Sequence, residues 1–184
     1  MQFPNRIWQP ALMGCLAGLM ACGGSNGSSA AKSISYSDPV STGYRLVKDA
    51  ASTDTNLVLD LVGPSGTQIQ GGLFTLTTDT TKATWGKPGT SEAYVLEGGA
   101  LNLGTGTKLL KSKVSGQTLT GALYQKGTTA AATLGSLPIL TVALDLKTGA
   151  SAGSLNLACT SAQILDAAGT TQTVTVDLGT AIVK

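Results

Sequence analysis

Histidine is absent from the 184-residue sequence, and its absence excludes several kinds of chemistry. Without an imidazole there is no Ser-His-Asp or Cys-His catalytic arrangement, no His-ligated zinc and no haem held by a proximal histidine. Charged residues are also few, at 12%, and twelve Lys and Arg against ten Asp and Glu leave a formal net charge of +2. Such a weak field does not attract nucleic acid, so none is expected as a partner.

Aromatic residues make up only 4% of the chain, and helix-forming Glu, Gln, Arg and Lys are scarce, whereas Gly, Ser and Thr are abundant. This composition favours turns and strands over helices. No helical repeat of apolar residues runs for the three turns that a stable amphipathic helix needs. The 42% of hydrophobic residues are enough for one core, and the length indicates one domain.

From residue 38 onward, short runs of strand-forming residues alternate with Gly, Asn, Asp or Pro. Period two is plain in 140–146, where every second residue is apolar. Because each apolar strand face must be buried against another sheet, the pattern predicts an all-β fold, a two-sheet jelly-roll-type β-sandwich of about nine or ten strands. The expected strands are 44–49, 56–62, 73–78, 93–96, 109–114, 118–124, 137–146, 154–159, 163–165 and 172–178.

The N-terminus has the pattern of a targeting segment. One positive charge, Arg6, precedes an uncharged apolar run at 11–21, which is shorter than the ~20 residues of a transmembrane helix. Leu19-Met20-Ala21-Cys22 follows and resembles a bacterial lipobox. The resemblance implies cleavage before Cys22 and a diacylglyceryl group on its thiol. We therefore expect a signal peptide over 1–21, a lipid-anchored tether over 22–37 and the sandwich over 38–184.

Two alternatives to this anchor remain. Cys15, preceded by Leu12, Met13 and Gly14, is a rival site, although it would leave an apolar region of only a few residues interrupted by Pro10. The segment could instead be a plain secretory signal or an uncleaved apolar terminus. The small polar residues of 23–37 favour a flexible tether with a mean reach of roughly 20 Å.

Similarity to Gram-negative lipoproteins implies a location. Because no Asp directly follows Cys22, the outer membrane is favoured over the inner one. With Cys15 removed and Cys22 lipidated, only Cys159 remains, so no intramolecular disulfide is available. Nothing in the sequence lowers the pKa of Cys159, and we interpret it as a small buried core residue rather than a nucleophile.

The order of the strand signatures resembles that of cohesin-like domains, which are jelly-roll sandwiches related to some carbohydrate-binding modules. The similarity covers about residues 44–178 and implies a non-enzymatic role in protein adhesion or scaffolding. A single such domain, with no dockerin and no cellulase, does not imply a cellulosome scaffold. The matching positions are Phe74 and Asp79 at the end of one strand, and Ile164, Leu165, Asp166 and Gly169 in a late hairpin.

The sequence offers little support for a catalytic or metal-binding site. The acid pairs Asp60 with Asp79 and Glu92 with Glu97 would have to lie ~5–10 Å apart for glycoside hydrolysis, and nothing in the sequence places them together. The segment 49–56 is the nearest approach to a calcium loop, yet the same residues suit a plain turn. We therefore expect no enzymatic activity, no cofactor and no metal.

Binding of a polysaccharide is the alternative function. Trp85 and Tyr94 are the aromatic residues that could stack on sugar rings, and their other interpretation is that they cap one end of the core. Lys111 and Lys113 share one strand face and are expected to protect an exposed sheet edge. The expected partners are thus a membrane, through the lipid, and either a protein or a polysaccharide.

Overall fold

The computed structural model describes residues 30–127 and 129–184, and all regular elements in these ranges are strands. In this part of the chain, no helix is long and apolar enough to cross a membrane. The strands are β1 (Ile34–Ser37), β2 (Tyr44–Lys48), β3 (Asn56–Val62), β4 (Gln68–Thr78), β5 (Ala83–Gly86), β6 (Val95–Glu97), β7 (Leu110–Ser115), β8 (Thr118–Tyr124), β9 (Ala132–Thr133), β10 (Leu140–Leu146), β11 (Gly153–Leu155), β12 (Leu157–Asp166), β13 (Thr171–Thr173), β14 (Val176–Asp177) and β15 (Thr180–Val183).

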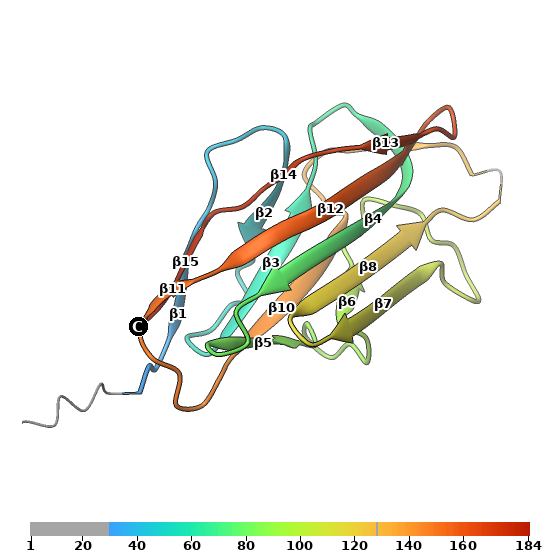
Figure 1. Cartoon of the computed structure of the whole chain (residues 1–184). Coiled ribbons are helices and arrows are strands. Elements are labelled where there is room, and N and C mark those ends of the chain that lie inside the picture. The colour runs from blue at the N-terminus through green and yellow to red at the C-terminus, as the bar shows by residue number, and fades with distance from the viewer. Residues whose placement is uncertain (1–29, 128) are drawn as a thin grey trace, which may run out of the picture.

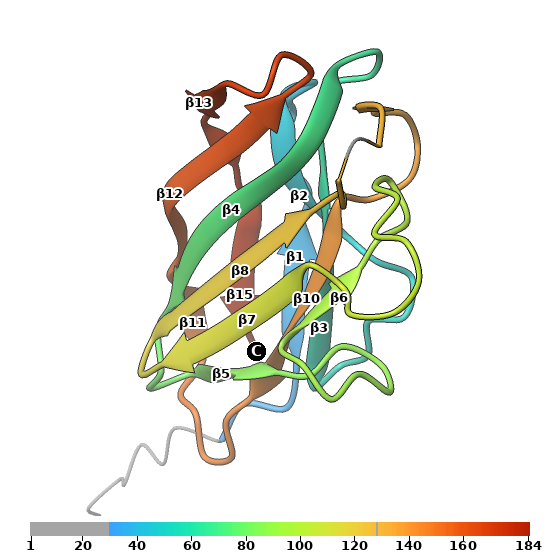
Figure 2. The same ribbon diagram turned by 90° about the vertical axis from the view of Figure 1, so that its right-hand side faces the viewer.

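Two six-stranded sheets lie face to face (Figure 1, Figure 2). The first has the order β14-β2-β3-β10-β5, with β6 also paired to β10, and the second has the order β13-β12-β4-β8-β7, with β9 paired to β4. All these pairings are antiparallel except that of β14 with β2. The predicted fold class, an all-β sandwich, is confirmed.

The core lies between the sheets and uses the positions that period two selects. On β3, Leu57, Leu59 and Leu61 are buried, and on β4 of the facing sheet Phe74 and Leu76 are buried. All five belong to one hydrophobic cluster. Because burial of such a side chain contributes about 1.5–3 kcal/mol, this cluster is the main source of stability.

A third, three-stranded sheet, β1-β15-β11, joins the two ends of the described chain (Figure 1). Ile34 of β1 lies opposite Val183 of β15, and both side chains are buried. The expected boundary between tether and sandwich at residue 38 is therefore too late, because 34–37 form a strand. The sequence does contain a pattern that indicates this strand, because the apolar residues Ile34 and Tyr36 alternate with serines over a short stretch with period two.

Several strand boundaries also differ from the prediction. Residues 83–86 around Trp85, which are not among the expected strands, form strand β5, paired with β10. Segments 154–159 and 163–165 contribute to β11 and to the single long strand β12, which has a register shift between Cys159 and Ser161. The expected strand 172–178 divides into β13 and β14, which belong to different sheets. Such bulges and sheet changes leave no clear signal in a hydrophobic pattern.

Candidate binding face of the sandwich

The outer face of the second sheet carries mostly uncharged polar side chains along β4 and β8. Along β4, Phe74 and Leu76 are buried whereas Leu73, Thr75 and Thr77 are only half-buried, as expected for side chains that point to opposite faces. The same alternation occurs in β8, with Leu119 and Leu123 inside. Figure 1 looks onto this face, and no described segment crosses in front of β4 or β8.

The strand register arranges the outward side chains in rows across the sheet. Thr75 lies opposite Thr120 of β8 and Ser161 of β12. The next outward residue of β4, Thr77, lies opposite Thr118. Threonine is favoured here because its branched side chain suits a pleated surface, and its hydroxyl remains available to a partner. Neither β4 nor β8 contains a charged residue, so the centre of the face is neutral.

Two lysines lie along one edge of this face. Lys111 and Lys113 on β7 are exposed and lie opposite Ala122 and Thr120 of β8. Strand β7 is the last strand of its sheet, and lysines on such a strand discourage pairing with a strand of another molecule. This placement agrees with the edge-protecting role predicted for the two lysines.

The two ends of the face differ in polarity. At one end, where β8 ends, Tyr124 lies next to Gly71 and near the apolar Leu73 and Leu165. A Cβ atom on Gly71 would overlap the ring of Tyr124, so the ring covers bare backbone. At the other end a polar hollow of about 240 Å³ is lined by Thr77, Thr78, Asp79, Gln117, Asn156 and Ala158. The face therefore offers an apolar end, a neutral centre and a polar end.

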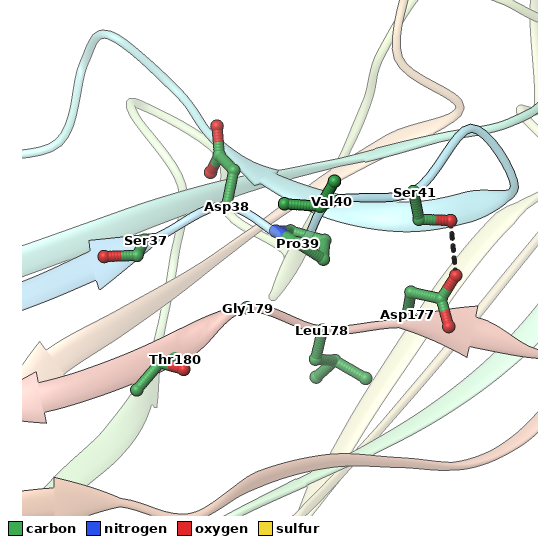
Figure 3. A pocket seen from close by; sticks show the side chains of 9 residues that line it. All are labelled: Ser37, Asp38, Pro39, Val40, Ser41, Asp177, Leu178, Gly179 and Thr180. Atoms are coloured by element: carbon green, nitrogen blue, oxygen red, sulfur yellow. Dashed lines mark hydrogen bonds between the residues drawn. The ribbon is translucent and has the colours of Figure 1, made fainter.

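Another open hollow, of about 500 Å³, lies where the chain passes between the third sheet and the first (Figure 3). Its two carboxylates are engaged locally. Asp177 accepts a hydrogen bond from the Ser41 hydroxyl at 2.5 Å, and Asp38 accepts one from the backbone N–H of Lys48 at 2.7 Å. These hydrogen bonds fix the loop between β1 and β2 in place. The polar groups around the hollow therefore have a structural role in this loop.

Trp85 lies inside the fold. It is 6% exposed, and its Nε1 donates a hydrogen bond to the backbone oxygen of Gln117 at 2.8 Å. Its ring is therefore not available as a flat platform for a sugar. Tyr94 precedes β6 and is half-buried, and its backbone N–H donates to Ser112 Oγ at 3.1 Å. Binding of a polysaccharide by this pair stays a prediction, to which these positions add no support.

The other candidate residues are dispersed. Asp60 lies on β3 of the first sheet and Asp79 follows β4 of the second. Glu92 is paired with Lys87 at 3.3 Å, whereas Glu97 is paired with Lys108. Neither acid pair proposed for hydrolysis is brought together by a hydrogen bond or a shared hollow of the described chain.

The side chains of 49–56 hold a turn. The Asp49 carboxylate accepts the Ala51 N–H at 2.6 Å, and Ser52 Oγ both donates to the Val58 carbonyl and accepts its N–H, each at 3.0 Å. Within residues 30–127 and 129–184, no group of three or more acidic or cysteine side chains is placed to hold a metal ion.

Cys159 is half-buried on β12 beside the bulge, and its Sγ donates to the Ser161 carbonyl at 3.4 Å. Burial raises the pKa of the Cys159 thiol, which keeps it protonated and unreactive at neutral pH. Cys22, the predicted lipidation site, lies outside the described residues, as does its rival Cys15.

Comparison with known proteins identifies the fold. No protein-family model matches the sequence, and no curated protein matches it. Among solved structures, the sixth cohesin of scaffoldin B from Acetivibrio cellulolyticus, in complex with a Cel5 dockerin, is similar with a TM-score of 0.53 and 21% identity, covering 76% of this chain and 97% of that one. A type II cohesin domain from the same organism's cellulosome gives 0.52 and 11%, covering 76% and 94%.

A third similar structure is the seventh ScaB type I cohesin from Pseudobacteroides cellulosolvens. It has a TM-score of 0.50 and 12% identity, and the match covers 73% of this chain and 85% of that one. At these identities the similarity shows the fold alone. The described chain is thus a β-sandwich with a cohesin-like fold, in agreement with the resemblance found in its sequence.

Proposed function

We propose that this chain is a non-enzymatic, lipid-anchored binding module of the bacterial cell envelope, whose sandwich binds a protein partner through the outer face of β12, β4 and β8. The observation that carries the proposal is the neutral, open centre of that face, where Thr75 and Thr120 lie side by side on a rigid sheet. The centres of protein interfaces are depleted of charge and enriched in aromatic residues, and the outward Tyr124 would provide such an aromatic contact within a partner's footprint on this face.

The similar structures support protein recognition as a use of this fold. One of them is a cohesin bound to a dockerin. Because one fold serves many functions, we infer protein binding by this chain from its own outer face and not from the fold alone. The face indicates only that the partner has a surface complementary to a neutral, threonine-rich sheet.

The lipid anchor is the second part of the proposal. Residues 1–21 would be the signal peptide, Cys22 would carry the lipid, and the tether would end where the sandwich begins, at strand β1 (Ile34–Ser37). Two or more acyl chains hold a protein stably at a bilayer. The described chain begins beside β1 and β11, whereas Tyr124 lies at the far end of β8 (Figure 1). The apolar end of the face would therefore point away from the anchored end, with the outer membrane as the proposed location.

The anchor is tested by metabolic labelling of producing cells with an alkyne fatty acid. The wild-type chain should be labelled, and Cys22→Ser should abolish the label while Cys15→Ser should not. A label that persists in Cys22→Ser and disappears in Cys15→Ser would move the anchor to the rival site. No label in any form would contradict lipidation.

The binding face is tested by placing a photo-crosslinking amino acid at Thr75 or Thr120 of the full chain in intact cells. Thr84, an exposed threonine on β5 of the other sheet, is the matched control position. We expect one defined crosslinked protein from the two face positions and none from Thr84. The crosslink at Thr75 should disappear when Thr120→Lys places a charge in the centre of the face. Equal crosslinking at all three positions would contradict the assignment.

A further inference from the structure

Strand β13 forms one edge of the second sheet and pairs only with β12 (Figure 2). The Val174 N–H, just after β13, donates to the Ala162 carbonyl at 3.0 Å, so these two residues form a hydrogen-bonded pair. Such pairs alternate along an antiparallel ladder, and the N–H and carbonyl groups of Thr171 and Thr173 therefore point away from β12. None of these groups has a hydrogen-bond partner within the described chain.

Two other edge strands have features that discourage pairing with a strand of another molecule. Strand β7 carries the exposed Lys111 and Lys113. On β11, an edge of the third sheet, Lys82 Nζ donates to the Ser154 carbonyl at 2.7 Å and so occupies a backbone acceptor of that strand. Strand β13 consists of Thr171-Gln172-Thr173, all exposed. It contains neither a charged residue nor a proline, so these protecting features are missing from it.

The neutrality of β13 favours a second copy of this chain as its partner. Identical edges carry identical charges, and like charges placed directly opposite each other are destabilising. The carboxylate of Asp166, at the turn before β13, is satisfied within that turn by the N–H groups of Ala168 and Thr170 and by the Gln172 amide. Two copies of β13 can therefore approach each other without charge repulsion along the strand.

The residue order of β13 has the symmetry that self-pairing requires. One threonine lies on each side of Gln172, so a two-fold axis through Gln172 places Thr171 of one copy opposite Thr173 of the other. In this register each free N–H meets a free carbonyl, and every unpaired backbone group of both strands gains a partner. The opposed threonines are also favourable cross-strand pairs.

We propose that β13 pairs with β13 of a second copy, antiparallel and centred on Gln172, so that the second sheets of the two molecules form one continuous sheet. This goes beyond the proposed function, because it uses backbone groups at the sheet edge and not the side chains of the outer face. Only one short strand of each copy takes part, so the contact is small and the association is reversible. Confinement of the copies to one membrane by the proposed anchor would favour the pairing, although the pairing does not require it.

The test is disulfide formation in the purified full chain, held in a mild detergent and treated with a thiol oxidant. Gln172→Cys should give a disulfide-linked dimer, because the two copies of residue 172 form a non-hydrogen-bonded pair with Cα atoms about 4.5 Å apart. Thr171→Cys alone should not, since its counterpart in the other copy lies beyond the ~7 Å reach of a disulfide. A chain with both Thr171→Cys and Thr173→Cys should form the dimer, because these positions face each other.

Thr84→Cys, at an exposed position on β5 of the other sheet, is the matched control and should give no more dimer than wild type. Mass spectrometry of the linked peptides distinguishes a disulfide between two copies of residue 172 from one formed by Cys159 or another native cysteine. Adding Thr171→Lys and Thr173→Lys to Gln172→Cys should lower the yield at least about tenfold, because lysines then lie opposite each other.

The proposal would be overturned if Gln172→Cys formed no disulfide between its two copies, or if its yield were no higher than that of Thr84→Cys or Thr171→Cys. An undiminished yield in the lysine variant would also overturn it. This readout is independent of lipidation and of the protein partner on the outer face.

Discussion

The ring of Tyr124 lies over Gly71 on the outer face of the second sheet, where the two residues are directly opposite in the register of β8 and β4. A Cβ atom on Gly71 would overlap the ring and would come within 2.6 Å of the Leu123 carbonyl oxygen. Position 71 therefore requires glycine, because the ring of Tyr124 packs directly against the backbone there and leaves no room for a side chain.

Gly71→Ala should accordingly destabilise the fold by about 1–3 kcal/mol, because the added methyl group forces the ring or the strand to move. The free energy of unfolding is measured by urea denaturation. Gly135→Ala is the matched control: its new Cβ meets nothing within 4 Å, so the expected change is within about 0.5 kcal/mol. Similar losses at both positions would contradict the packing of Tyr124 on Gly71.

Two buried tyrosines are expected to respond oppositely to the loss of their hydroxyls. Tyr36 Oη donates to the Leu46 carbonyl at 3.0 Å and accepts the Gly179 N–H at 2.7 Å, which connects the third sheet to β2. Tyr36→Phe leaves both groups unpaired and should cost about 1–3 kcal/mol. Tyr44 Oη is buried with no partner in the described chain, so Tyr44→Phe should be neutral or stabilising. Thermal and urea unfolding of both variants check this, and a loss in Tyr44→Phe as large as that in Tyr36→Phe would refute it.

The burial of Trp85 gives a prediction for fluorescence and stability. In a Trp8→Phe background Trp85 is the remaining tryptophan, and its emission should be blue-shifted in the folded protein and shift to the red on unfolding. Trp85→Ala should cost about 3–5 kcal/mol as a cavity in the core. Trp85→Phe should cost less, about 0.5–1.5 kcal/mol, mainly from the lost bond to Gln117. Solvent-exposed emission from the native state would contradict the assignment of Trp85 to the core.

Where a strand has strong alternation and clear turn residues at both ends, its bounds follow from the sequence. The segments 56–62 and 118–124 were predicted with the observed bounds of β3 and β8. Strand β1 was not predicted, because its alternation extends over only two apolar residues within a serine-rich segment. Strand β5 was missed because Trp85, between lysines, glycine and proline, has the local composition of a loop.

The candidate face and hollow could not be derived from the sequence. That Thr75 and Thr120 lie side by side depends on register, which is decided by pairings between distant segments. The hollow needs residues from three separate segments, among them Gln117 from the β7–β8 turn and Asn156 from between β11 and β12. Of these residues, the sequence pattern singles out only Asp79, as an acid at the end of a strand. Convergence of this kind is a property of the folded chain.

The last prediction concerns pH and the carboxyl group of Asp60. Burial raises the pKa of Asp60, the nearby Asp49 raises it further, and the Thr141 hydroxyl, which donates to Asp60 at 2.6 Å, opposes the shift. The folded protein thus holds this proton more tightly than the unfolded chain does. The contribution of Asp60 to stability is fully present below its unfolded pKa and is lost as pH rises through the raised folded value.

Asp60→Asn removes the charge at every pH while keeping an oxygen that can accept from Thr141. The variant should therefore have a larger free energy of unfolding than wild type at about pH 7, and the difference should shrink towards about pH 3. Asp166→Asn should show the opposite sign, because the Thr170 N–H and the Gln172 amide lower the pKa of Asp166, so its contribution is present at neutral pH and is lost on acidification. Urea unfolding at a series of pH values measures both curves. A neutral-pH loss in Asp60→Asn that matches that of Asp166→Asn would show that Asp60 is stabilised as the ion, contrary to its burial.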